Sequence, residues 1–330
     1  MTRRHLKQGI GVLALAATLL PLVVSAQEEA TPRQWLQRMA AAAHQLNYEG
    51  TFVYSHDGHM QSMRIVHGYD GGHEKERLLS LSGPSREVLR DDEQVTCILP
   101  DDNEVVVERS GPRRPLAFKQ PTSVEQLEKY YTLSDGGDER VAGFMARKIV
   151  ITPRDRYRYG HTFWLHGDNG LLLRSDLVND SGKVIEQMMF TSLNLFDSLP
   201  EKLLQPQTEG RDVVWQRQSD VSDQVGTDVP WRVEDLPPGF VMDSHRRHAM
   251  PGNHALVEHV VYTDGLASVS VFVEREEGDN PGFIGSSRIG AVSAYARIAD
   301  GYHVTVVGEV PPVTVKQMAE SVVRQSGAGQ

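Results

Sequence analysis

The sequence predicts an α+β fold in which antiparallel β-meanders are partly covered by helices. The first observation is a helix pattern over residues 31–46, with a capping residue at its start and one apolar face. The second is a change in the sequence pattern after residue 46. Short runs rich in β-forming residues recur about every ten residues, with turn pairs between them. The third is a repeat of the same order, helix and then meander, from residue 123 to residue 193.

The first helix has a clear start signal. Thr31 occupies the capping position, Pro32 the first helical position, and Gln34 completes a capping box. The apolar side chains that follow are spaced to share one helix face, and they are Trp35, Met39, Ala42 and Leu46.

A meander of short strands is predicted after this helix. The strand-like runs are Gly50–Tyr54, Gln61–His67, Glu76–Leu81, Arg86–Leu89, Val95–Leu99 and Glu104–Glu108. The turn pairs between them include Asp57-Gly58, Asp70-Gly71, Gly83-Pro84, Asp91-Asp92 and Asp101-Asp102. Asp-Gly pairs favour tight hairpin turns, so we expect neighbouring strands to be antiparallel.

A second helix is expected over residues 123–131, where Ser123 and Gln126 have the spacing of a capping box. Further strands are expected at 145–152, 160–166, 171–178 and 183–193. Residues 27–200 therefore form one predicted domain with a curved sheet and covering helices.

The composition changes at residues 201–228, which are rich in Gln, Glu, Asp, Ser and Thr and poor in large apolar residues. This composition is typical of a linker. A smaller α+β domain is predicted over residues 229–330, closed by a helix from Thr314. Its expected strands are 256–263, 266–275, 289–298 and 302–310.

Residues 1–26 have the pattern of a secretory signal peptide. The start is basic (Arg3, Arg4, Lys7), an apolar run follows from Ile10 to Val24, and small residues precede a predicted cut before Gln27. An uncleaved anchor is the alternative, but the run is shorter than the roughly 20 residues that span a bilayer. Both the general secretory and the twin-arginine route stay open. Because Gln27 is not cysteine, a lipoprotein anchor is not expected.

Charge and cysteine content exclude several classes of protein. The formal net charge is −10, and it becomes −13 without the three basic residues of the leader. A polyanion-binding protein normally has the opposite balance, so we do not expect nucleic acid as a partner. The single cysteine, Cys97, excludes an intrachain disulfide.

The motifs of common enzymes are missing from the sequence. His56 and His59 flank a hairpin turn and supply two metal ligands at most. His73-Glu74 begins like a zinc-protease motif, but Arg77 occupies the position of the second histidine. We therefore expect no catalytic activity, no cofactor and no metal.

Two groups of residues are candidates for binding. Arg154, Arg156 and Arg158 alternate with tyrosines in an acidic chain, and on an extended segment they would share a face for phosphate or carboxylate groups. A surface strand with salt bridges explains them equally well. Large apolar residues on the meander strands could line a cavity for an acyl chain or simply form the core, and they are Phe52, Tyr54, Phe163, Leu165, Met188 and Phe190. A cleft between the two domains would also suit an extended peptide.

The sequence resembles the RseB/MucB family in six segments that occur in the same order. Three lie in the large domain: Gly50-Thr51-Phe52-Val53-Tyr54, Val141-Ala142-Gly143 through Ile151-Thr152-Pro153-Arg154-Asp155, and Arg158-Tyr159-Gly160. Three lie in the small domain: Leu236-Pro237-Pro238-Gly239-Phe240, Asp264-Gly265-Leu266-Ala267 through Val271-Phe272-Val273-Glu274, and Val306-Val307-Gly308-Glu309-Val310-Pro311.

This resemblance implies a fold and a function. The family's large domain is similar to the lipoprotein carriers LolA and LolB, an unclosed antiparallel β-barrel with helices across its opening. The family's members are periplasmic negative regulators of sigma-E or of its alginate-controlling counterpart. They bind the periplasmic part of a membrane-spanning anti-sigma factor of the RseA/MucA kind and shield it from proteolysis.

Lipopolysaccharide or lipoprotein acyl chains are the implied release signal. The arginine face would then meet lipid phosphates or acidic peptide residues. A periplasmic lipid or lipoprotein carrier is the alternative function, although the second domain argues against a plain carrier. Whether two copies form a homodimer stays open.

Overall fold

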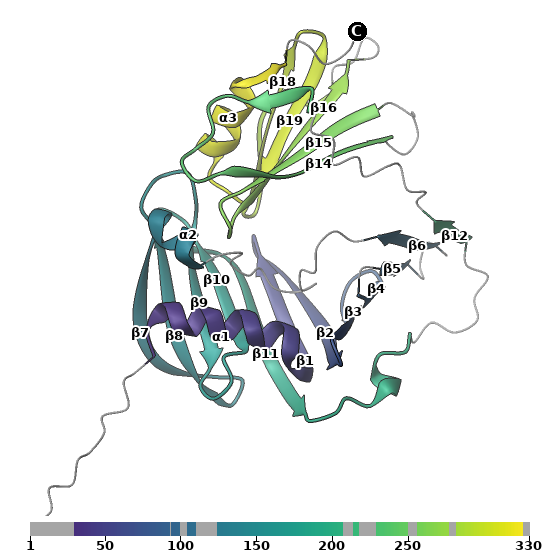
Figure 1. The fold of residues 1–330 in the computed structure, drawn as a ribbon, viewed down its shortest axis with the longest axis vertical. Helices are drawn as coiled ribbons and strands as arrows, with labels where there is room; N and C mark the ends of the chain where they lie inside the picture. Colours follow the sequence, from purple (N-terminus) through teal and green to yellow (C-terminus); the bar gives the residue numbers. More distant parts are fainter. Residues whose placement is uncertain are drawn as a thin grey trace, which may run out of the picture. The chain divides into compact units, whose positions relative to one another are not determined.

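The computed structural model describes residues 30–92, 94–99, 104–109, 124–206, 214–217, 229–249, 256–276 and 282–325. Figure 1 shows a large sheet with helix α1 lying across one of its faces, and a smaller sheet that carries helix α3. The expected leader, residues 1–26, lies outside the described residues. None of the described helices is long and apolar enough to cross a membrane.

Helix α1 (Pro32–Gln45) begins where the sequence predicts it. The Thr31 hydroxyl accepts a hydrogen bond from the Gln34 backbone N–H at 3.3 Å, and the Gln34 side chain accepts one from the Thr31 N–H at 2.7 Å. This reciprocal pair satisfies two of the donors that a helix start leaves open. The helix packs its apolar face against the sheet, burying Trp35, Leu36, Met39, Ala42 and Ala43.

Twelve of the described strands form the large sheet, in the order β12-β6-β5-β4-β3-β2-β1-β11-β10-β9-β8-β7. The sheet is not closed, since its order ends at β12 and β7, and all its pairs are antiparallel except β12 with β6. The first six strands are β1 (Asn47–His56), β2 (His59–Asp70), β3 (His73–Ser80), β4 (Glu87–Asp91), β5 (Gln94–Leu99) and β6 (Glu104–Arg109). The others are β7 (Tyr131–Val141), β8 (Phe144–Pro153), β9 (Gly160–His166), β10 (Leu172–Val178), β11 (Val184–Phe196) and β12 (Val214–Arg217). The predicted unclosed antiparallel sheet is confirmed.

Helix α2 (Val124–Tyr130) lies within the predicted range, while Ser123 lies outside the described residues. Strand β7 was not predicted. Its Ser-Asp-Gly-Gly-Asp stretch has low β-propensity, and pairing with β8 overrides that propensity, with an irregularity in the register between Asp135 and Asp138. The expected linker 201–228 contains two short elements, the 3₁₀ turn η1 (Glu201–Leu203) and strand β12.

The smaller sheet has six strands in the order β14-β15-β16-β19-β18-β17. They are β14 (Val241–Ala249), β15 (Leu256–Thr263), β16 (Ser268–Arg275), β17 (Gly285–Ile289), β18 (Val292–Ala299) and β19 (Tyr302–Gly308). Strands β13 (Trp231–Val233) and β20 (Val322–Arg324) form a separate pair, and α3 (Pro312–Glu320) contacts β18 and β19. The core contains Val271, Val304, Val306, Val315 and Met318.

Candidate functional site

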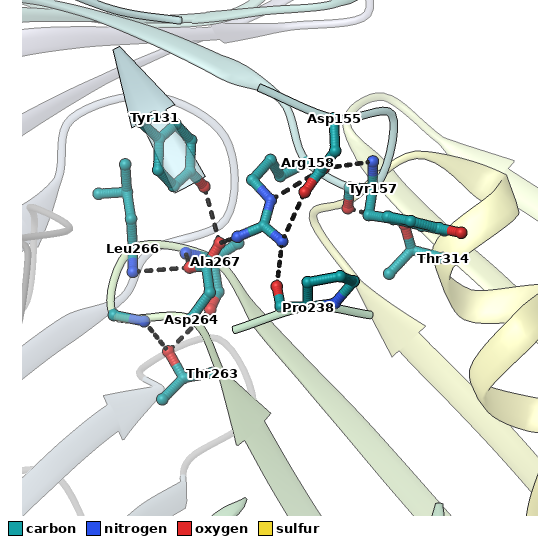
Figure 2. Close-up of polar contacts among 11 residues, drawn as sticks. Tyr131, Asp155, Tyr157, Arg158, Pro238, Thr263, Asp264, Leu266, Ala267 and Thr314 are labelled. Atoms are coloured by element: carbon teal, nitrogen blue, oxygen red, sulfur yellow. Dashed lines mark hydrogen bonds and ion pairs between the residues drawn. The ribbon is translucent and has the colours of Figure 1, made fainter. Parts of the chain in front are cut away.

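A buried ion pair joins the large and the small domain (Figure 2). Arg158 lies between β8 and β9, and its Nη1 donates to Oδ2 of Asp264, in the turn between β15 and β16, at 2.7 Å. Both side chains have 0% exposed surface. Arg158 also donates from Nε to Asp155 at 3.0 Å and from Nη2 to the Pro238 carbonyl. The guanidinium is therefore paired on all sides, as a buried charge must be.

Asp264 is equally well satisfied. Besides Arg158, its Oδ2 accepts a hydrogen bond from the Tyr131 hydroxyl at 2.8 Å. Its Oδ1 accepts from the backbone N–H groups of Leu266 and Ala267 at 2.9 and 2.7 Å. Burial raises the pKa of Tyr131 well above its ordinary value, and the charge of Asp264 raises it further while Arg158 opposes this. The carboxylate thus orders the β15–β16 turn and holds the start of β7.

Aromatic rings enclose the Arg158 guanidinium. Its central carbon lies 5.0 Å from the ring centroid of Tyr130, 5.5 Å from that of Tyr131 and 5.2 Å from that of Phe240. Gly239 fits against this cage because it has no side chain: its φ is +88°, and an added Cβ would stand 2.4 Å from the Tyr130 ring. We call these residues, with Arg158 and Asp264, the domain seam.

Two further contacts extend the domain seam. The Thr314 hydroxyl, at the start of α3, donates to the carbonyl of Tyr157 at 2.7 Å. Tyr159, Leu177 and Ala291 form a small buried apolar cluster that joins the large sheet to the β17–β18 turn. The two domains therefore meet through an ion pair, hydrogen bonds and apolar packing.

The three candidate arginines do not form one face, which corrects the sequence prediction. The segment from Arg154 to Arg158 is a series of bends, because the Asp155 side chain accepts a hydrogen bond from the Tyr157 N–H at 2.9 Å and turns the chain. Arg154 and Arg156 are exposed, whereas Arg158 is buried in the domain seam. Alternate side chains share a face only on an extended backbone, and the turn at Asp155 interrupts the extended backbone here.

The apolar candidates lie in the core of the large domain. Phe52, Phe163, Leu165, Met188 and Phe190 are buried, and Tyr54 is half-buried. In the β1–β11 register Phe52 stands opposite Phe190 and Tyr54 opposite Met188, so these four share one face. The rings of Phe52 and Phe190 meet edge to face at 5.8 Å. In the described conformation Phe52 packs against Phe190 and the other four candidates are fully or partly enclosed in the protein, as expected for core residues.

A polar groove with a volume of about 570 Å³ lies where three hairpin turns approach each other. The turns are β1–β2 and β10–β11 of the large sheet and β17–β18 of the small one. The lining is made of Ser55, His56, Asp57, Gly58, Asn179, Lys183, Val184, Ile185, Glu186, Gln187, Arg288 and Gly290. Charges of both signs line it. Burial raises the pKa of the adjacent Tyr54, and the charge and hydrogen bond of Glu186 raise it further.

Sequence reasoning missed the role of Asp264 and Tyr131. Thr263-Asp264-Gly265 looks like an ordinary turn, in which a carboxylate commonly bonds the N–H groups just after it. The partner of Asp264, Arg158, is 106 residues away in the sequence. No local pattern indicates that these two side chains meet.

Comparison with known proteins identifies the family. The MucB/RseB N-terminal domain matches residues 31–208 and the MucB/RseB C-terminal domain matches residues 226–323. The chain belongs to the MucB/RseB family. The sigma factor AlgU regulatory protein MucB of Pseudomonas aeruginosa is 35% identical over 316 residues, covering 93% of this chain and 95% of that protein. The sigma-E factor regulatory protein RseB of Escherichia coli is 28% identical over 314 residues, covering 94% of this chain and 96% of that protein.

Solved structures agree with this assignment. A complex of MucA and MucB from Pseudomonas aeruginosa superposes with a TM-score of 0.72 at 34% identity, covering 90% of this chain and 99% of that one. A crystal structure of MucB superposes with a TM-score of 0.63 at 33% identity, covering 88% of this chain and 97% of that one. The expected family and fold are confirmed.

Proposed function

We propose that this chain is a periplasmic regulator that binds the periplasmic segment of a membrane-spanning anti-sigma factor and protects it from proteolysis. The observation that carries the proposal is the likeness, over 90% of the chain, to MucB in a structure that contains MucA. Regulation of this kind works by binding and needs no catalytic step. The signal-peptide pattern of residues 1–26 supports export to the periplasm.

The polar groove is the proposed docking place for part of the anti-sigma segment. Its volume of about 570 Å³ suits a few residues of an extended peptide, and its lining supplies both donors and acceptors. Lys183 and Arg288 are exposed there and can pair with acidic peptide residues. Because both domains line the groove, peptide affinity would depend on how the domain seam holds them together.

Lipid is the proposed release signal. A ligand can shift an equilibrium only through its differential affinity for two states. The apolar face of β1, β9 and β11 is packed in the described conformation, so an acyl chain would bind a state in which Phe52 and Phe190 separate. The exposed Arg154 and Arg156 remain candidates for lipid phosphates. Lipopolysaccharide and lipoprotein acyl chains are both candidate signals.

The binding step is tested with the purified mature chain and a fluorescent periplasmic segment of the MucA-like anti-sigma factor from the same organism. We expect saturable binding. Lys183→Glu with Arg288→Glu should weaken it roughly tenfold. Lys202→Glu with Arg232→Glu changes the net charge equally at exposed sites outside the groove lining, and it should bind as the wild type does. Absence of binding to the wild type would refute the proposed function, whereas equal loss in both pairs would remove the groove from it.

The release step is tested by adding lipopolysaccharide, or a diacylated lipopeptide, to the preformed complex under a fixed concentration of protease. The bound segment should survive longer than the free one, and lipid should shorten its lifetime. Arg154→Glu with Arg156→Glu should raise the lipid concentration needed. If lipid leaves the complex intact, the release mechanism is wrong while the binding function stands.

A further inference from the structure

A buried polar cluster lies on the helix-covered side of the large sheet, apart from the domain seam and the polar groove. In the strand register Tyr48 of β1 stands opposite His67 of β2, His67 opposite Glu76 of β3, and Glu76 opposite Arg90 of β4. Glu74 lies two residues before Glu76 and so faces the same side. His67, Glu74 and Glu76 are 0%, 2% and 1% exposed.

The tautomer of His67 is fixed by the backbone. Its Nδ1 lies 2.7 Å from the carbonyl oxygen of Leu46, which can only accept, so Nδ1 carries a proton. The other ring nitrogen, Nε2, lies 3.1 Å from Oε1 of Glu74. A neutral ring would point its Nε2 lone pair at a carboxylate oxygen, which is repulsive. A cation bound by both atoms would turn this repulsion into attraction.

The arrangement around His67 is that of a metal ligand. Histidines that bind metals commonly donate their second N–H to a backbone carbonyl, which orients the ring. The ligand atoms of His67, Glu74 and Glu76 all lie within 4.8 Å of one another. Imidazole nitrogen with carboxylate oxygens is a ligand set that Zn²⁺ accepts, at about 2.0–2.2 Å from the ion.

Buried polar groups beside the cluster that lack hydrogen-bond partners give an independent indication of a bound ligand. The Tyr48 hydroxyl and the Nε and Nη1 groups of Arg90 are buried and have no hydrogen-bond partner. Tyr48 and Arg90 are 0% and 3% exposed, and the Tyr48 ring stacks on His67 with centroids 5.1 Å apart. Buried polar groups normally find partners, including ordered water. A water molecule held by a metal ion would donate a hydrogen bond to the Tyr48 hydroxyl oxygen.

The charges and the surroundings of the cluster also fit a divalent cation. Arg90 pairs with Glu76 at 2.8 Å, which leaves one net negative charge from the two carboxylates. On the outer side His44 of α1 lies 3.2 Å from Oε2 of Glu74, and its side chain is 36% exposed. His44 is thus a partly exposed residue of α1 in direct contact with the buried Glu74.

We propose that His67, Glu74 and Glu76 bind a divalent transition-metal ion, such as Zn²⁺, which accepts this ligand set, with water as a further ligand. The ion links β2 and β3 directly, and it links α1 through the hydrogen bond between Glu74 and His44. The site is independent of the proposed anti-sigma partner.

The test uses the purified mature chain, stripped with a chelator and titrated with ZnCl₂ at pH 7.5. We expect one Zn²⁺ per chain by mass spectrometry of the metal, and a melting temperature raised by roughly 5 °C at 100-fold excess over Kd. Glu74→Gln and His67→Gln should each weaken binding at least tenfold. His73→Gln is the matched control, because His73 starts the same strand but is exposed, and its variant should bind as the wild type does.

A second measurement covers variants that fail to fold. Anomalous scattering at the zinc edge, from crystals of the wild-type chain, should place the ion beside His67 Nε2. Absence of stoichiometric binding, unchanged binding in both Glu74→Gln and His67→Gln, or an ion located elsewhere would each overturn the proposal.

Discussion

Arg158 and Asp264 are 106 residues apart in the chain, yet their side chains meet at 2.7 Å and neither exposes any surface. One comes from the loop between β8 and β9 of the large sheet, and the other from the β15–β16 turn of the small sheet. Each charge is buried and has its partner in the other domain, so each domain contributes to the stability of the other. The domain seam is therefore where substitutions should affect both domains together.

Arg158→Ala should lower the free energy of unfolding by about 3–5 kcal/mol, because it leaves the buried Asp264 carboxylate without its cation. Urea unfolding followed by circular dichroism measures this loss. Arg156→Ala is the matched control: it removes an exposed arginine two residues away and should cost less than about 0.5 kcal/mol. Equal effects of the two variants would show that the ion pair does not stabilise the seam.

Gly239→Ala should destabilise the chain by about 1–3 kcal/mol through two effects. The φ of +88° strains any side chain, and the new Cβ would stand 2.4 Å from the Tyr130 ring. Gly301→Ala separates these effects, because Gly301 has a φ of +75° but nothing within 4 Å of the added Cβ. Thermal unfolding should show a larger loss for Gly239→Ala. A loss no larger than that of Gly301→Ala would mean that the Tyr130 ring moves aside freely.

Tyr131 should make the stability depend on alkaline pH. Burial and the charge of Asp264 raise its pKa in the folded chain, whereas in the unfolded chain it ionises near pH ~10. Above that pH the folded chain binds more protons than the unfolded one, so the free energy of unfolding falls as pH rises.

Tyr131→Phe should make this fall less steep by up to about 1.4 kcal/mol per pH unit, measured by urea unfolding between pH 9 and 11. It should also cost about 1 kcal/mol at neutral pH, since one hydrogen bond to Asp264 is lost. Parallel pH profiles for the two proteins would contradict the raised pKa.

Gly50→Ala should destabilise the large sheet by about 1–3 kcal/mol, because the added Cβ would lie 2.4 Å from Cε1 of Phe190 and 2.8 Å from the Ser192 carbonyl oxygen. The collision with the ring can be relieved by a smaller side chain. In a Phe190→Leu background the same substitution should therefore cost less, as a double-mutant cycle of urea unfolding would show. Additive costs would place the strain on the backbone contact alone.

Local signals predicted much of this fold. The capping box at Thr31 located α1, and the Asp57-Gly58 and Asp70-Gly71 turns located the first two hairpins of the large sheet. Strand β7 was missed because its acidic, glycine-rich stretch forms a strand only through pairing with β8. The prediction of an arginine face was wrong because the Asp155 side chain turns the chain by accepting a hydrogen bond from the Tyr157 N–H. Aspartate is a common turn residue, so this signal was present in the sequence.

The long-range parts could not be predicted in the same way. The partner of Arg158 depends on how the two domains meet, which no local pattern encodes. The cluster of His67, Glu74 and Glu76 could be predicted in part from the sequence. The Asp70-Gly71 turn sets the β2–β3 register, and that register places His67 opposite Glu76. What the sequence did not reveal is that this face is the buried one.

An open sheet leaves two edges at which another chain could add a strand, and β7 is one of them. The irregularity between Asp135 and Asp138 interrupts its regular pairing, and Arg147 of β8 forms ion pairs with both carboxylates. Kinks and charges of this kind keep edge strands from templating aggregates. We therefore expect the residues that made β7 hard to recognise as a strand to disfavour polymerisation through that edge.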